Sequence, residues 1–218
     1  MRTVVLPGVL RPPSDARLVV AAMEEHDLPR GASVLDVFTG SGILAVSAAM
    51  LGARAVTATD ISRRAVLNAR LNGVLNRVRL RARRGDLFAP VTGERFDLVL
   101  ANPPYVPGAD DELPAGGAER AWEGGRSGRL LIDRFCAEVA SHLSPGGSVL
   151  IVHSSLCGED PTRDTLREVG LEVDVLSRER GPLGPITRAR AQLLERRGLL
   201  GPGEREEEML VIRGHSAG

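Results

Sequence analysis

The chain has 218 residues, a length that suits one α/β domain with a full hydrophobic core. Its 43% hydrophobic and 26% charged residues are typical of a folded globular protein and exclude a disordered chain. Its 28 basic residues balance 28 acidic ones, so no net field attracts nucleic acid, and a nucleic-acid partner is not expected. The longest apolar stretch, residues 43–51, is far shorter than the roughly 20 residues of a membrane span. We therefore expect a cytoplasmic protein with no membrane partner.

Short β-rich runs alternate with helical patterns along the chain. Ser14 is expected to cap a first helix with its hydroxyl, and this helix ends before Pro29. Further helices are expected at residues 43–51, 62–71, 129–143, 161–169 and 188–197. Strands are expected at residues 33–38, 55–59, 78–83, 96–101, 148–153, 172–177 and 208–212.

This alternation predicts an α/β fold, with a single doubly wound, mainly parallel sheet covered by helices on both faces. We expect one domain over residues 1–218, with residues 1–30 as a helical lead-in, because no linker or repeat divides the chain. Arginines alternate with small apolar residues over 77–83, which predicts guanidinium groups along one face of a strand. A charged edge strand explains them better than a nucleic-acid patch, so we assign them no function.

Polar residues gather where the first four expected strands end, and open α/β sheets bind ligands at this edge. The first strand runs into Asp36 and the turn 39–42, where Gly40 and Gly42 lack Cβ atoms and let the backbone approach a ligand. A tight turn without a ligand would need the same glycines. Residues 40–45 also satisfy the dinucleotide pattern G-x-G-x-x-A, so this turn alone does not choose between cofactors.

Carboxylates follow the next two strands. Asp60 offers two acceptor oxygens to the hydroxyls of a ribose, although it could instead cap the helix that follows. Asp86 could accept the exocyclic amine of an adenine flanked by Leu87 and Phe88, or it could be a turn aspartate without a ligand. These acids and the glycine turn are typical of a site for an adenosine-bearing cofactor.

The fourth strand runs into Asn102-Pro103-Pro104-Tyr105. Two successive prolines fix φ, so the Asn102 side chain and the Pro103 carbonyl hold fixed directions. A planar NH₂ group can donate to both of these oxygens and present its lone pair to an electrophilic methyl group, while Tyr105 stacks on its plane. A hydride-transfer enzyme has no need of these four residues, so they favour methyl transfer over a dehydrogenase.

With these motifs the sequence resembles the class I S-adenosylmethionine-dependent methyltransferases, which have a Rossmann-like fold. Within this class it is similar to the HemK-type protein glutamine N5-methyltransferases. The resemblance covers nearly the whole chain, and the matching segments are 11–15, 36–42, Asp60, 85–88, 102–105, 122–128 and 209–212. Residues 102–105 are shared with N-methyltransferases of DNA, RNA and proteins, whereas residues 122–128 favour the glutamine branch.

The resemblance implies the cofactor S-adenosylmethionine, and no metal is expected. The implied cofactor-binding residues are Asp36, Thr39, Gly40, Gly42, Asp60, Ile61, Asp86, Leu87 and Asn102. The implied substrate-binding residues are Pro13, Asp15, Asn102, Pro103, Tyr105 and Trp122, and the segment around residues 13–15 would close over the site. The expected catalytic residues are Asn102, Pro103, Pro104 and Tyr105. For Trp122, a wall of the acceptor pocket and a packing anchor remain equally good interpretations.

About thirty residues precede the first expected strand, whereas bacterial release-factor methyltransferases usually carry a separate N-terminal helical domain. The short form resembles the eukaryotic and archaeal branch, which works with a small zinc-binding activator subunit. We therefore expect methylation of a glutamine in a protein such as a translation release factor, with an activator subunit as a further partner. Two alternatives stay open: methylation of a base amine in RNA or DNA, which would need base flipping, and a non-catalytic cofactor-binding scaffold.

Overall fold

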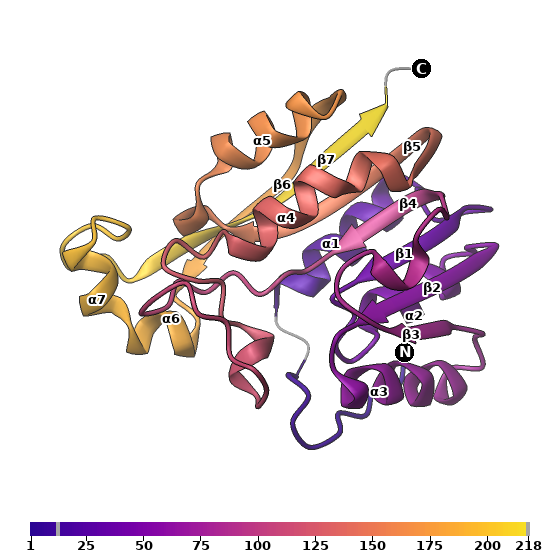
Figure 1. Cartoon of the computed structure of the whole chain (residues 1–218), viewed down its shortest axis with the longest axis horizontal. Coiled ribbons are helices and arrows are strands. Elements are labelled where there is room, and N and C mark those ends of the chain that lie inside the picture. The colour runs from indigo at the N-terminus through magenta and orange to yellow at the C-terminus, as the bar shows by residue number, and fades with distance from the viewer. Residues whose placement is uncertain (12–13, 217–218) are drawn as a thin grey trace.

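A seven-stranded sheet forms the centre of the computed structural model, which describes residues 1–11 and 14–216 (Figure 1). The strands are β1 (Ser33–Val37), β2 (Ala55–Asp60), β3 (Arg81–Arg84), β4 (Phe96–Ala101), β5 (Leu143–Ser154), β6 (Leu171–Pro182) and β7 (Glu206–Ser216). Their order across the sheet is β3-β2-β1-β4-β5-β7-β6. The strands β1 to β5 pair in parallel, whereas β7 runs antiparallel to both of its neighbours. The expected mainly parallel sheet is therefore confirmed.

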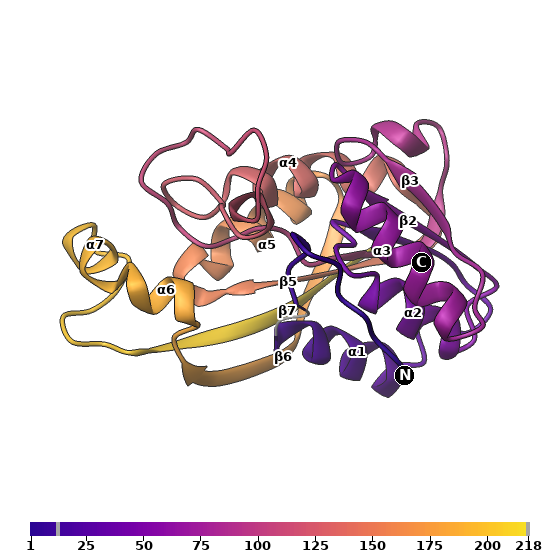
Figure 2. The same ribbon diagram turned by 90° about the horizontal axis from the view of Figure 1, so that it is seen from below.

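Helices cover both faces of this sheet. The α-helices are α1 (Asp15–Glu25), α2 (Ile43–Met50), α3 (Arg63–Leu75), α4 (Leu130–Val139), α5 (Glu159–Glu168), α6 (Pro185–Ala189) and α7 (Ala191–Arg196). Short 3₁₀ turns are η1 (Ala89–Val91), η2 (Glu119–Ala121), η3 (Ala140–His142) and η4 (Ser155–Cys157). Figure 2 shows α4 and α5 on one side of the sheet and α1 and α2 on the other. Within residues 1–11 and 14–216, no helix is long and apolar enough to cross a membrane.

Alternate residues of the strands contribute to two hydrophobic cores. On β1, Leu35 and Val37 pack into the core beneath α4 and α5, whereas Val34 packs into the core beneath α1, α2 and α3. Central strands are buried on both faces, so they appear in the sequence as continuous apolar runs bounded by polar residues. For this reason the predicted strand 96–101 coincides with β4.

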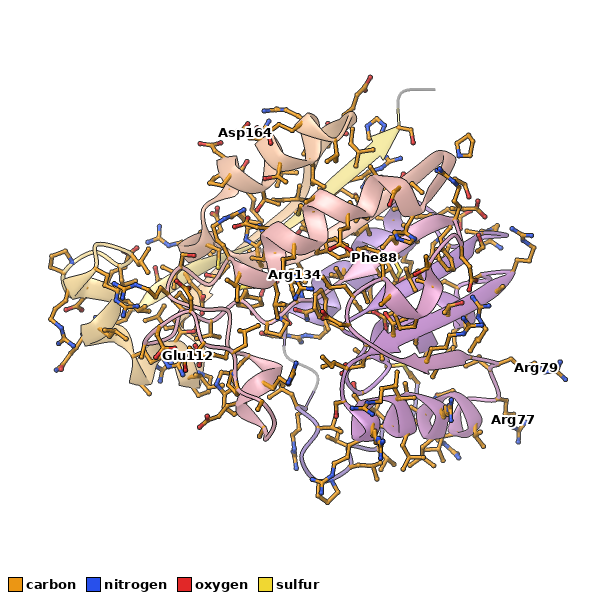
Figure 3. All side chains as sticks on the ribbon, in the orientation of Figure 1. Arg77, Arg79, Phe88, Glu112, Arg134 and Asp164 are labelled. Carbon is orange, nitrogen blue, oxygen red and sulfur yellow. The ribbon has the colours of Figure 1, made fainter. Side chains whose placement is uncertain are left out.

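The third strand differs from its prediction. It begins at Arg81 rather than at residue 78, because α3 continues to Leu75 and Arg77 then adopts a left-handed φ of 59° in the turn that follows. Arg77 and Arg79 project into solvent beyond this edge of the sheet (Figure 3). Arg81 and Arg83 do share a strand face, and both form ion pairs with Glu94. The prediction of a charged edge strand is confirmed for these two residues.

Two helix predictions also need correction. The Ser14 side chain makes no capping hydrogen bond, because its backbone is already helical, and the Ala16 amide donates instead to Asp15 Oδ1 at 2.7 Å. The helix expected at 188–197 is two short helices, α6 and α7, which meet at Arg190.

Helices α6 and α7 form an excursion between β6 and β7 (Figure 1) and hold the loop that follows β4. Arg190 Nη2 lies 2.7 Å from Glu123 Oε2, and its Nη1 donates to the Pro107 carbonyl at 2.9 Å. Arg197 donates to the carbonyls of Gly108 and Ala109, each at 2.6 Å. These bonds attach the loop that carries Trp122 to the excursion formed by α6 and α7.

Candidate active site

The carboxyl ends of β1, β2 and β4 open into a cavity of about 770 Å³. Parallel strands bring the residues that follow them to one edge of the sheet, so most of the expected site residues meet here. The expected residues that line the cavity are Asp15, Asp36, Thr39, Gly40, Asp60, Ile61, Asp86, Leu87, Asn102, Pro103, Pro104, Tyr105 and Trp122. Pro13 lies outside the described residues.

Gly42 is not part of the cavity lining. It has a φ of +82°, and a Cβ atom at this position would lie 2.7 Å from the Cα atom of Ala69 on α3. Glycine is therefore required where α2 begins because the helix packs closely against α3, and because the backbone is left-handed. Gly40, with a φ of +52°, does line the cavity.

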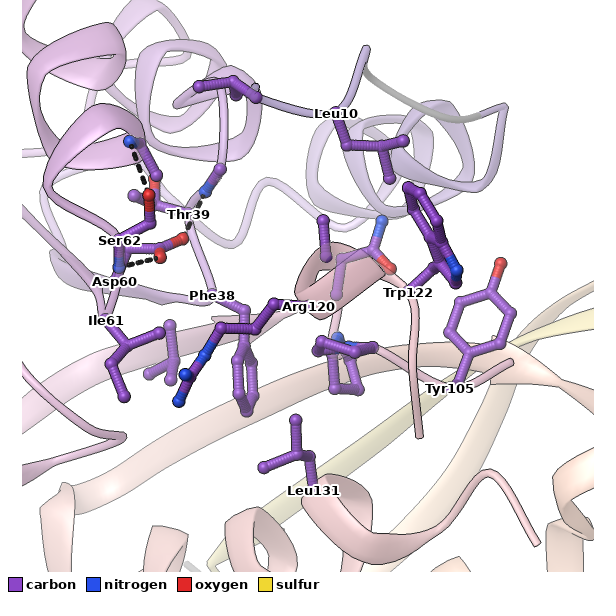
Figure 4. Close-up of a pocket in the computed structure, with 18 of the residues that line it drawn as sticks. Leu10, Phe38, Thr39, Asp60, Ile61, Ser62, Tyr105, Arg120, Trp122 and Leu131 are labelled. Carbon is purple, nitrogen blue, oxygen red and sulfur yellow. Dashed lines mark hydrogen bonds between the residues drawn. The ribbon is translucent and has the colours of Figure 1, made fainter. Parts of the chain in front are cut away.

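Asp60 joins the turn after β1 to the helix after β2. Its Oδ2 accepts a hydrogen bond from the Gly40 amide at 2.9 Å, and its Oδ1 accepts one from the Ser62 amide at 2.8 Å (Figure 4). Burial raises the pKa of Asp60, and these backbone hydrogen bonds oppose that effect. A carboxylate has about four acceptor positions, so both oxygens can still accept further hydrogen bonds from a ligand.

Asp36 lies beneath the same turn. Its Oδ2 accepts hydrogen bonds from Thr39 Oγ1 at 2.5 Å and from the Ala45 amide at 3.1 Å. Its Oδ1 is buried and has no hydrogen-bond partner among the described residues. Burial raises the pKa of Asp36 to about 7. Since buried polar atoms are nearly always satisfied, this oxygen is suited to a donor or cation supplied by a ligand.

Two residues of the cavity wall have strained backbones. Phe38 has a φ of 61° and Leu87 a φ of 43°, in the left-handed region that bulky side chains rarely adopt. Such strain persists where the surrounding structure holds it, and it is concentrated at ligand sites. Here the Phe38 ring packs against Phe135 of α4, with ring centroids 6.1 Å apart.

Asp86 forms an ion pair across the opening of the cavity. Its Oδ2 lies 2.6 Å from Arg134 Nη2 on α4, which leaves Oδ1 available. Leu87 lines the cavity as expected, but Phe88 does not flank it. The Phe88 ring is buried in the core, where it stacks on His142 with ring centroids 4.4 Å apart. The prediction that Phe88 flanks a ligand is therefore wrong.

The residues after β4 are held from the opposite side by the first helix. Asp15 is only 2% exposed, and its Oδ1 accepts a hydrogen bond from Asn102 Nδ2 at 3.1 Å. Its Oδ2 accepts a hydrogen bond from the Tyr105 hydroxyl at 2.6 Å. Because a carboxylate only accepts, the Asn102 amide must turn its nitrogen toward Asp15, and Asn102 Oδ1 remains available as an acceptor. Burial raises the pKa of Tyr105 well above its usual value, so the hydroxyl stays a donor.

Trp122 lines the same end of the cavity. In Figure 4 its indole lies between Leu10 and Tyr105. Backbone hydrogen bonds hold the loop: the Val106 amide donates to the Trp122 carbonyl at 2.8 Å, and the Gly124 amide donates to the Val106 carbonyl at 3.0 Å. This position favours the interpretation of Trp122 as a cavity wall.

Five charged residues of the cavity were not expected from the sequence: Arg63, Arg84, Arg120, Arg134 and Glu207. Arg134 pairs with Asp86, and Arg120 extends from η2 over Phe38 (Figure 4), where its charge opposes part of the rise that burial causes in the pKa of Asp60. Glu207 of β7 accepts hydrogen bonds from Ser154 Oγ at 2.5 Å and from the Gly184 amide at 2.9 Å. Arg120, Arg134 and Glu207 do not follow a parallel strand, so no local signal marks them.

Comparisons with known proteins agree with this architecture. Residues 15–103 match the family model described as ribosomal protein L11 methyltransferase. Among solved structures, the Encephalitozoon cuniculi Mtq2-Trm112 complex aligns with a TM-score of 0.66 at 22% identity, covering 96% of this chain and 99% of that one. This likeness shows the fold of the class I methyltransferases.

Relatives by sequence identify the family. A Methanocaldococcus jannaschii protein named N5-glutamine methyltransferase is 35% identical, with 81% of this chain and 87% of that protein covered. Human Methyltransferase HEMK2 is 33% identical, and the match covers 79% of this chain and 85% of that protein. The Gloeobacter violaceus release factor glutamine methyltransferase is 36% identical over 72% of this chain, which spans 57% of that protein. The chain belongs to the HemK family of protein glutamine N5-methyltransferases.

Proposed function

We propose that this protein transfers a methyl group from S-adenosylmethionine to the side-chain amide nitrogen of a glutamine in another protein, and that residues 1–218 act as one methyltransferase domain. The observation that carries the proposal is the hydrogen bond from Asn102 Nδ2 to Asp15, which leaves Asn102 Oδ1 as an acceptor beside the Pro103 carbonyl. Relatives named for release factors and for ribosomal protein uL3 support a protein of the translation apparatus as substrate.

The chemistry of the cavity suits the cofactor. Asp60 would accept hydrogen bonds from the ribose hydroxyls, and the available oxygen of Asp86 would accept one from the adenine amine. The unpaired, buried oxygen of Asp36 would compensate the positive charge of the cofactor's amino group. Other residues proposed for this part of the cavity are Thr39, Gly40, Ile61 and Leu87. We assign Gly42 a packing role.

The residues of the chain act by holding the acceptor. When bound, S-adenosylmethionine supplies the electrophilic methyl group. Asn102 Oδ1 and the Pro103 carbonyl would accept the two N–H hydrogens of the glutamine amide, drawing its nitrogen toward tetrahedral geometry. The amide would release one proton to solvent as the new N–C bond forms and the sulfur–methyl bond breaks, which leaves S-adenosylhomocysteine as the second product. The chain contributes position and oriented dipoles rather than a strong base.

The direct experiment supplies the purified protein with labelled S-adenosylmethionine and either a release factor or a total lysate. Mass spectrometry of the labelled product is expected to locate one methyl group on a glutamine side chain. Label in RNA or DNA would favour the base-amine alternative, and cofactor binding without label in any acceptor would favour the scaffold.

We also propose a small protein partner that activates the enzyme. Every exposed large hydrophobic side chain of the described residues lies on the N-terminal segment, α2 or α3: Met1, Val4, Met50, Leu67, Val74 and Leu75. Apolar residues gathered on one side of a molecule are typical of a contact surface. The Encephalitozoon cuniculi relative in fold was solved together with Trm112. A small zinc-binding protein of this kind is expected to raise turnover without changing cofactor affinity, and full turnover by the chain alone would argue against it.

A further inference from the structure

Two asparagines of α3, Asn68 and Asn72, and the residue that caps its C-terminus, Asn76, bind the backbone of the N-terminal segment. Asn76 accepts from the Arg2 amide and donates to the Arg2 carbonyl, both at 2.7 Å. Asn72 makes the same pair of bonds with Val4, both at 2.9 Å. Asn68 accepts from the Leu6 amide at 2.7 Å and donates to the Val4 carbonyl at 2.8 Å. We call residues 2–6 the strap and the three side chains the asparagine ladder.

The spacing of the asparagines along the helix matches the spacing of the residues that they bind along the strap. Four residues of an α-helix advance about 6 Å, and two residues of an extended chain advance roughly 6.6 Å. Every fourth residue of α3 can therefore meet every second residue of the strap over three successive pairs. Asparagine carries both a donor and an acceptor, so each side chain can serve an N–H and a carbonyl together.

Burying the asparagine side chains of the ladder costs free energy unless they form hydrogen bonds. Asn68 is 0% exposed and Asn72 is 2% exposed, and a buried amide that loses its partners costs free energy. Asparagine is also a weak helix former, so its repetition on one helix face calls for a tertiary explanation. The contact with the strap supplies that explanation.

The strap leads directly into the candidate active site. Gly8, Val9 and Leu10 follow it, and all three line the cavity. In Figure 4 Leu10 points toward the indole of Trp122. The ladder also reaches the turn 39–42 that follows β1, because Asn72 Nδ2 donates to the Ser41 carbonyl at 2.8 Å.

We infer that Asn68, Asn72 and Asn76 are positioning residues, which hold the strap so that residues 8–10 cover the cavity and slow the release of the bound cofactor. The inference rests on the proposed function, because it requires the cavity to bind S-adenosylmethionine or its product. In this proposal the rate at which the cofactor leaves depends on the strap as well as on the residues that follow the strands.

Two proline substitutions in the strap test the inference. Val4→Pro removes the amide that donates to Asn72, whereas Val5→Pro is the matched control, because the Val5 amide makes no hydrogen bond within the described part of the chain. Neither residue lies in a helix or a strand. Val4→Pro is expected to release S-adenosylhomocysteine about fivefold to tenfold faster, the change that corresponds to the loss of one hydrogen bond. Val5→Pro is expected to match the parent.

Stopped-flow fluorescence can measure the release, because Trp122 is the single tryptophan of the chain and lines the cavity. The melting temperature of the free protein should be lower for Val4→Pro than for Val5→Pro, because buried Asn72 loses one partner. Hydrogen exchange at Val9 and Leu10 should slow on ligand binding in the parent and less so in Val4→Pro. Equal release rates for the two variants would overturn the inference. If the parent itself binds no S-adenosylhomocysteine, the proposed function fails instead.

Discussion

The side-chain nitrogen of Asn102 donates a hydrogen bond to Asp15 Oδ1 across 87 positions of sequence, at 3.1 Å. Asp15 is on the first helix and Asn102 follows the fourth strand. The bond selects one of the two orientations of the Asn102 amide, and with it the atom that faces an acceptor. The Tyr105 hydroxyl shares the same carboxylate, so Asp15 holds both ends of the segment 102–105.

Asn102→Ala is expected to lower turnover by about 10² to 10³-fold, because one preorganised polar contact to the acceptor is lost. The affinity for S-adenosylhomocysteine should stay within a few-fold of the parent. Steady-state methylation and calorimetry measure the two effects. Turnover close to that of the parent would mean that Asn102 only shapes the turn. For Asn102→Asp, activity retained on a base amine would favour the nucleic-acid alternative.

Asp15→Asn is expected to lower turnover by about tenfold to hundredfold with little change in cofactor affinity. An amide at this position can donate as well as accept, so the Asn102 side chain would no longer have one orientation. Asp27→Asn, an exposed acid just beyond α1, is the control and should behave like the parent. A loss of activity that followed a loss of folded protein, seen by thermal unfolding, would contradict the positioning role.

Asp60→Ala is expected to weaken the binding of S-adenosylmethionine by roughly tenfold to hundredfold, through the loss of charge-assisted hydrogen bonds. The change also removes the partner of the Gly40 amide, so the turn after β1 should become more mobile. Calorimetry with S-adenosylmethionine and with a nicotinamide cofactor tests the assignment. Tighter binding of the nicotinamide cofactor by the parent would disprove it.

The raised pKa of Asp36 predicts that the free energy of unfolding depends on pH. Its pKa is about 7 in the folded protein and near 3.8 when unperturbed, so the folded state binds the proton more tightly. Its stabilising contribution is therefore full below the lower pKa and is lost as the pH rises through about 7. Relative to Asp36→Asn, the parent should lose stability as the pH rises from about 4 to about 7, as measured by urea unfolding. S-adenosylhomocysteine should reduce this loss, and parallel pH profiles for the two proteins would contradict the assignment.

Arg134→Ala tests whether the ion pair with Asp86 orients the adenine end of the site. The pair is exposed on both sides, at 44% and 47%, so its removal should change stability little. Affinity for S-adenosylhomocysteine should fall a few-fold, whereas affinity for the analogue with hypoxanthine in place of adenine should not. Arg167→Ala, on the exposed surface of α5, is the matched control. Equal losses for both ligands would show that Arg134 does not act on the amine.

The sequence alone determined the sheet and the edge at which a site could form. Apolar runs bounded by polar residues predicted the strands, most accurately the central strand β4, which is buried on both faces. Because parallel strands end at one edge, Asp36, Asp60 and Asn102 could be expected to meet without knowledge of the packing. All three line the cavity.

Only the tertiary structure decided which distant segments complete the site. Asp15 reaches Asn102, Arg134 reaches Asp86, and the strap reaches the asparagine ladder through the packing of helices, which local periodicity does not encode. Packing also overruled local expectations: Phe88 enters the core, and Gly42 is required by the closeness of α3. Periodicity specifies which face of an element is buried, whereas the partner on that face depends on how all the elements pack together.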